Sequence, residues 1–170
     1  MYKRQTWNDP LEPIRVAQAV KKMGLRHVVI TSVDRDDLKG DFGASIWADT
    51  IKQTKKVNPG CTVEVLTPDF KGFEPALKIV FDSKPDIFSH NVECVERISK
   101  AVRAQANWQR SLGVLEKSIQ HGLRTKTGIM VGLGEEVEEV KKTMRQVVDL
   151  GVQIFTCLLY TSPSPRDHQP

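Results

Sequence analysis

Short runs of β-branched residues alternate with longer segments of helical periodicity along most of this chain. Runs with the composition typical of buried strands occur in segments 27–32, 62–66, 86–90, 125–131 and 152–156. Apolar residues at helical spacing, with helix-ending residues after them, occur in segments 13–24, 44–57, 73–83, 95–102, 108–120 and 135–150. Helices of this length between strands favour right-handed βαβ units. The sequence therefore predicts an α/β fold built on a parallel sheet.

Two architectures satisfy this alternation, an open doubly wound sheet and a barrel, and periodicity alone leaves both open. The position of Glu64 favours the barrel. In the segment 62–66, alternation places Val63 and Val65 on one face and Glu64 on the other. A carboxylate is costly in a packed core without a partner. It is better suited to the mouth of a catalytic barrel, where sites gather at the carboxyl ends of strands.

The composition is that of an ordinary globular protein. Of the 170 residues, 39% are hydrophobic and 27% are charged, and the formal net charge is +4. The basic residues are dispersed, which argues against a nucleic-acid footprint, and no apolar run approaches the ~20 residues of a membrane span. Cys61, Cys94 and Cys157 form no disulfide framework. We expect an intracellular protein, cytoplasmic in a bacterium or in the mitochondrial matrix of a eukaryote.

Both ends of the chain differ from the rest. Residues 157–167 read CLLYTSPSPRD and resemble the translation of a transposase-type sequencing adapter, and residues 1–5, MYKRQ, resemble the opposite adapter end. Pro163 and Pro165 disfavour regular structure in the C-terminal stretch. We therefore expect residues 6–156 to be one native domain, with adapter-like residues 1–5 before it and disordered adapter-like residues 157–170 after it.

Polar residues follow the predicted strands at their carboxyl ends. The first loop, 32–37, holds three carboxylates and Arg35, whose fork can bind a carboxylate; the alternative is an exposed, helix-capping loop. The next two loops contain Asp69 and the pair His90 and Asn91. A lone histidine is more often structural than catalytic, whereas a neutral amide suits a polar ligand.

The last of these loops contains Gly132 and Gly134 and lacks the third glycine of the dinucleotide fingerprint. Glutamates at 135, 136, 138 and 139 would repel a phosphate, although they complement the helix dipole. We therefore expect this loop to contact a neutral adenine or ribose rather than a pyrophosphate.

Several longer motifs of the chain are similar to those of lipoyl synthases. They are VITSVDRDDL at 29–38, EVLTPDFKG at 64–72, HNVE at 90–93, RSL at 110–112, TKTGIM at 125–130 and VGLGE at 131–135. The resemblance covers residues 11–156. It implies a partial (β/α) TIM-type barrel of the radical S-adenosylmethionine kind, incomplete at both ends.

The resemblance also implies an activity. Such enzymes use two [4Fe–4S] clusters and S-adenosylmethionine; a 5′-deoxyadenosyl radical activates an octanoyl chain, and the auxiliary cluster supplies two sulfur atoms. The partner would be an octanoylated lipoyl-carrier protein, either a lipoyl domain or the glycine-cleavage H protein. Neither a nucleic acid nor a membrane is expected as a partner.

Matching positions imply roles for particular residues. Catalytic roles fall on Lys126 and Glu64. Cofactor-binding roles fall on Ser32, Asp34, Arg35, Asp36, Asn91, Gly132 and Gly134. Within this set, Glu64, Asn91 and Lys126 would line the barrel interior, and the two glycines would border the nucleoside.

The sequence departs from the family at its metal ligands. The two three-cysteine motifs, C-x3-C-x2-C and C-x4-C-x5-C, do not occur in it. Cys94 replaces the usual threonine of HNxET and is interpreted as a small buried residue. No residue is assigned to a metal, and we expect the chain alone to be inactive. The alternatives are a lyase or aldolase that forms a Schiff base on Lys126, and a non-catalytic binding barrel.

Overall fold

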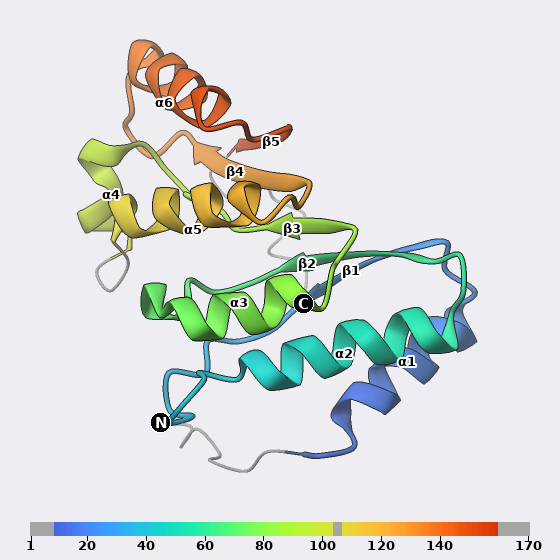
Figure 1. The fold of residues 1–170 in the computed structure, drawn as a ribbon. Helices are drawn as coiled ribbons and strands as arrows, with labels where there is room; N and C mark the ends of the chain where they lie inside the picture. Colours follow the sequence, from blue (N-terminus) through green and yellow to red (C-terminus); the bar gives the residue numbers. More distant parts are fainter. Residues whose placement is uncertain (1–8, 104–106, 160–170) are drawn as a thin grey trace, which may run out of the picture.

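The computed structural model describes residues 9–103 and 107–159, which contain one parallel sheet (Figure 1). Its strands, in spatial order, are β1 His27–Thr31, β2 Thr62–Leu66, β3 Ile87–Ser89, β4 Thr125–Val131 and β5 Ile154–Leu159. A doubly wound sheet reverses its strand order, which puts helices on both faces. Here the spatial order equals the chain order, so right-handed crossovers bring the connecting helices to one face. The predicted partial barrel is therefore confirmed.

The helices fall where periodicity predicted them. They are α1 Glu12–Met23, α2 Ala44–Val57, α3 Glu74–Asp82, α4 Glu96–Val102, α5 Trp108–Gln120 and α6 Val137–Asp149. A short 3₁₀ helix, η1 Phe70–Gly72, was not predicted; it needs a positive φ of 55° at Lys71, for which the sequence gives no signal. In the described parts of the chain, no helix is both long and apolar enough to cross a membrane.

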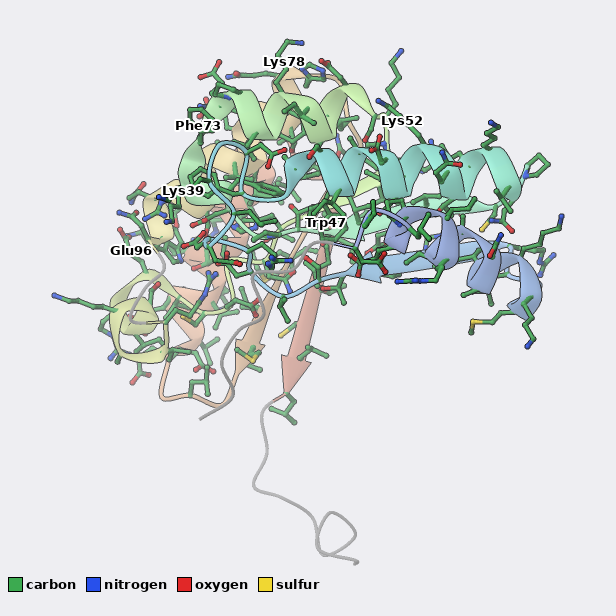
Figure 2. The ribbon with its side chains drawn as sticks, turned by 90° about the horizontal axis from the view of Figure 1, so that it is seen from below. Lys39, Trp47, Lys52, Phe73, Lys78 and Glu96 are labelled. Atoms are coloured by element: carbon green, nitrogen blue, oxygen red, sulfur yellow. The ribbon has the colours of Figure 1, made fainter. Side chains whose placement is uncertain are left out.

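The hydrophobic core lies between the sheet and its helices. Val63, Val65 and Phe88 are fully buried against a cluster that includes Ile51 of α2 and Leu77 of α3. Figure 2 shows the same division in the helices: Trp47 of α2 points toward the sheet and is 6% exposed, while Lys52 and Lys78 project away from it. Helix packing thus covers one face of the sheet.

The other face, called the bare face below, has no helix over it among the described residues. The strand register places the following side chains on it: Val29, Glu64, Leu66, Ile87, Ser89, Lys126, Gly128, Met130, Ile154 and Thr156. This face would be the interior of a barrel.

Two strands differ from their predictions. Strand β1 was predicted to be buried, but among residues 9–103 and 107–159 it is an edge strand paired with β2, and Val29 is 51% exposed. The stretch after residue 156 was predicted to be disordered, but β5 continues through residues 157–159, paired with 129–131 of β4. Backbone pairing needs no buried side chain, and all three residues are exposed. Pro163 and Pro165 lie outside the described residues.

Candidate functional site

The polar loops that follow β1, β2, β3 and β4 lie at the same edge of the sheet because all the strands are parallel. Lys71, in the loop after β2, joins the first two loops. Its ammonium lies 3.3 Å from Asp36 and 5.1 Å from the centre of the Phe42 ring. The prediction that these loops lie together at one edge of the sheet is therefore confirmed.

Arg35 does not have its fork free for a ligand. Its Nε and Nη2 donate to the two carboxylate oxygens of Asp37, at 2.9 and 3.0 Å. This pairing raises the pKa of Arg35. Ser32 is exposed, and its hydroxyl donates to the backbone carbonyl of Val33. In this structure the fork is therefore paired within its own loop, and the binding of a ligand carboxylate by Arg35 stays a prediction.

Negative charge gathers between the first two loops. Partial desolvation, together with the neighbouring Asp36 and Asp69, raises the pKa of Asp34. Asp69 is fixed by Arg110 of α5, whose Nη1 lies 3.2 Å from its carboxylate, and by the backbone N–H of Lys71. Because Asp36 and Asp69 are paired with Lys71 and Arg110, much of this negative charge is balanced by neighbouring cations.

Glu64 and Lys126 meet on the bare face. The sequence predicted Glu64 to be an interior carboxylate, and such a carboxylate requires a partner. Lys126 Nζ donates to Glu64 Oε1 at 2.7 Å, and the pair spans from β2 to β4 across β3. The Glu64 side chain is only 5% exposed and that of Lys126 is 23% exposed. His27 Nε2 stands 3.6 Å from the second carboxylate oxygen. The carboxylate is thus buried, but it is paired.

Asn91 lies next to the middle of β4. A Cβ built on Gly128 would meet Thr156 Oγ1 at 2.6 Å and Asn91 Oδ1 at 3.0 Å. The first distance is shorter than real Cβ contacts and the second is tighter than most, so the close approach of Thr156 and Asn91 favours glycine at position 128. The neutral Asn91 amide is therefore held on the bare face beside β4.

The loop 131–136, called the glycine loop below, already has an internal anion. The carboxylate of Glu135 accepts from the N–H groups of Gly132, at 2.5 Å, and Leu133, at 2.9 Å. Although partial burial opposes the shift, these backbone donors lower the pKa of Glu135. Glu135 occupies these N–H groups in this structure, so a phosphate would have to displace it to bind them. A Cβ on Gly134 would meet no atom within 4 Å, so the space beside this backbone is open.

His90 is a structural residue, as predicted for a lone histidine. It is 2% exposed, with Nδ1 2.9 Å from the carbonyl of Thr67 and Nε2 3.0 Å from Ser111 Oγ. Burial lowers its pKa. Cys94 is fully buried and burial raises its thiol pKa, in agreement with its interpretation as a small buried residue.

The buried His90 predicts a loss of stability in acid. The folded protein holds the ring neutral, so its pKa is lower than in the unfolded chain, where it is about 6.5. The stability that the neutral His90 ring contributes is fully present when the pH is above the pKa of the unfolded chain. As the pH falls below it, the unfolded chain takes up the proton first, and the free energy of unfolding should drop by about 1.4 kcal/mol per pH unit. Urea unfolding between pH 8 and pH 5 measures the slope.

The matched variant is His90→Gln, which keeps a neutral polar side chain and leaves His27 and His121 in place. Its free energy of unfolding should depend less on pH than that of the wild type over the same range, whatever its absolute stability. Equal slopes in the two proteins would contradict the assignment of His90 as a buried neutral group.

Comparisons with known proteins identify the family. Residues 1–147 match the radical SAM superfamily. The chain belongs to this superfamily. It is 55% identical over 164 residues to the lipoyl synthase of Rubrobacter xylanophilus, with 95% of this chain and 50% of that protein covered. The lipoyl synthase of Phocaeicola vulgatus is 49% identical, with 95% and 56% covered. This radical SAM chain spans about half the length of the curated relatives it matches.

Solved structures share its fold. Methylornithine synthase (PylB) gives a TM-score of 0.69 at 11% identity, over 99% of this chain and 49% of that one. SuiB of Streptococcus suis gives 0.70 at 9% identity, over 95% of this radical SAM chain and 36% of that one. At such identities the likeness concerns the fold alone, and it agrees with the partial barrel deduced from the strand order.

Membership of the radical SAM superfamily implies S-adenosylmethionine and iron–sulfur chemistry. Within residues 9–103 and 107–159, no group of three or more His, Cys, Asp or Glu residues could hold a metal ion. These residues do not fit an iron–sulfur cluster, and we assign none of them to one. The open backbone of Gly134 and the uncharged amide of Asn91 both lie along β4 and its loop, and the binding of a neutral nucleoside beside them stays a prediction.

Some residues that shape this site were not singled out from the sequence. Gly128 had a usable signal, since a glycine inside a strand pattern marks a close approach. Thr156 and Arg97 had none, because their contacts are with residues distant in the chain. Ser32, Asp34 and Asp36 lie at the edge beside β1, Glu64 and Lys126 on the bare face, and Gly132 in the glycine loop.

Proposed function

We propose that this chain forms the cofactor-facing and substrate-facing part of a lipoyl synthase, which inserts two sulfur atoms into a protein-bound octanoyl chain. The observation that carries the proposal is the 55% identity to a lipoyl synthase over 95% of the chain. The bare face supports it, because it combines a paired carboxylate with apolar residues in a barrel interior. An alkyl substrate needs apolar residues, and Val29, Leu66 and Met130 supply them on that face.

The S-adenosylmethionine nucleoside would lie against Asn91 and the glycine loop. When bound, this cofactor supplies a radical able to take hydrogen from an unactivated carbon, and two [4Fe–4S] clusters complete the proposed set. The carboxylates near Asp34 would face the positively charged groups of the cofactor. The Glu64 and Lys126 pair would keep a fixed polar contact in the interior and position the ligands beside it.

The proposed partner is an octanoylated carrier protein, a lipoyl domain or the glycine-cleavage H protein, in the cytoplasm or the mitochondrial matrix. The alkyl chain would enter from the carboxyl edge of the sheet, where the polar loops lie. The Schiff-base alternative has less support, because Lys126 donates to a carboxylate at 2.7 Å, whereas that chemistry requires a free neutral amine.

The proposal is tested in a chimera in which residues 11–156 replace the matching segment of the Rubrobacter xylanophilus enzyme. We expect the chimera to convert an octanoylated H protein to the lipoylated form, as followed by mass spectrometry. Asn91→Ala should raise the KM for S-adenosylmethionine about tenfold or more, because a ligand contact is lost. Lys78→Met, on the outer side of α3, is the control and should leave turnover unchanged. A folded chimera with both clusters that leaves the carrier octanoylated would refute the proposal.

A further inference from the structure

Arg97 of α4 makes an unusual set of contacts for an exposed arginine. Its Nε and Nη2 donate to the two carboxylate oxygens of Glu139 in α6, at 2.7 and 2.8 Å, and Nη2 also donates to the carbonyl of Gly134 at 2.8 Å. One guanidinium thus joins two helices and the glycine loop. The pairing lowers the pKa of Glu139 to about 2, so the carboxylate stays charged at all ordinary pH values.

The same glycine loop is held at its other end by Glu135, which accepts from the N–H groups of Gly132 and Leu133. Gly132 and Gly134 have φ of 95° and 98°, a region that glycine enters freely and that allows several loop shapes. Glu135 thus holds two N–H groups of the loop, and Arg97 holds the Gly134 carbonyl, so two side chains restrain its shape.

Arg97 also links this loop to the segment that carries Asn91. Residue 93, two positions after Asn91, pairs with β4: its N–H donates to Gly128 and its carbonyl accepts from Met130, at 3.1 and 2.8 Å. Helix α4 begins three residues later, at Glu96. The Arg97 guanidinium therefore ties the helix that follows the Asn91 segment to the Gly134 carbonyl of the glycine loop.

We propose that Arg97 is a positioning residue that sets the spacing between Asn91 and the glycine loop, and so the affinity of the site for an adenine nucleoside. The proposal rests on the proposed function, since it assumes that a nucleoside binds there. Without the guanidinium, the Gly134 carbonyl loses its donor and the loop can take other shapes. Binding must then select the competent shape, which weakens the apparent affinity.

The test uses the full chain and 5′-deoxyadenosine, the nucleoside part of S-adenosylmethionine, in an NMR titration. We expect Arg97→Ala to weaken binding roughly tenfold and to speed amide hydrogen exchange at Leu133. The unfolding midpoint should stay near that of the wild type, because the Arg97 side chain is 55% exposed. The lysine of Arg97→Lys can reach one acceptor but cannot form the two-pronged contact. Its nucleoside affinity should therefore lie between those of the wild type and Arg97→Ala.

The matched control is Lys141→Ala in α6. It removes an exposed ion pair with Glu138 of the same helix, α6, and leaves the glycine loop untouched. It should change neither binding nor exchange. Equal affinity in Arg97→Ala and wild type would overturn the proposal, as would an equal loss in Lys141→Ala. If the wild type binds no nucleoside, the cofactor assignment of the proposed function fails. Leu133 exchange then decides the Arg97 contact: faster exchange in Arg97→Ala supports it, and unchanged exchange overturns it.

Discussion

Replacing Lys126 with methionine is expected to lower the free energy of unfolding by about 3–5 kcal/mol. The Glu64 side chain is 5% exposed, and its closest charged partner is the Lys126 ammonium at 2.7 Å. Methionine has nearly the length of lysine, so the substitution removes the charge while largely filling the space. Among the described residues, it leaves the buried carboxylate with the His27 ring, at 3.6 Å, as its remaining ion-pair partner. Urea unfolding followed by circular dichroism gives the free energy.

Two further variants show whether the loss comes from the unpaired charge. Glu64→Gln combined with Lys126→Met removes both charges and should recover most of the loss, since no isolated carboxylate remains. Lys78→Met breaks the surface pair with Asp82, whose side chains are 64% and 52% exposed, and should cost less than about 1 kcal/mol. A Lys126→Met protein as stable as the Lys78→Met protein would show that Glu64 is solvated after all.

A single methyl group at Gly128 is expected to destabilise the fold by about 1–3 kcal/mol. The new Cβ would lie 2.6 Å from Thr156 Oγ1 and 3.3 Å from the backbone oxygen of the same residue. Side chains can rotate away, but the backbone of β5 can yield only if its pairing with β4 changes. Asn91 would be displaced as well, so nucleoside binding should weaken together with stability.

Gly113→Ala is the matched control, because it adds the same methyl group inside helix α5, where a Cβ meets nothing within 4 Å. Alanine is the better helix former, so this variant should be more stable by about 0.5–1 kcal/mol. Adding Thr156→Ala to Gly128→Ala removes the nearest contact and should restore part of the loss. If Gly128→Ala were as stable as the wild type, the crowding at Gly128 would not be real.

Much of the fold follows from local patterns in the sequence. The bounds of α2, β2, α5 and β4 match their predicted ranges, because each has a periodic apolar pattern and clear end signals such as Asn58-Pro59-Gly60. The exposure of β1 and the extension of β5 could not be predicted in this way. Both depend on which neighbour a strand has, and that is decided by the whole sheet.

The candidate site shows the same division. The sequence located its loops, and it singled out Glu64 as a carboxylate that a packed core could not hold without a partner. It did not show that Arg35 is occupied by Asp37, or that Glu135 fills the N–H groups of the glycine loop. Hydrogen bonds of this kind depend on the direction of each side chain, which residue types and spacing do not specify.

The sequence by itself determined the alternation of strands and helices, the positions of the polar loops and the family resemblance, since each is a property of residues close together in the chain. Only the tertiary structure decided between a barrel and a doubly wound sheet, through the strand order. It also paired Glu64 with Lys126 and joined Arg97 to Gly134. These pairs lie 62 and 37 residues apart in the chain, so only folding brings them within hydrogen-bond distance.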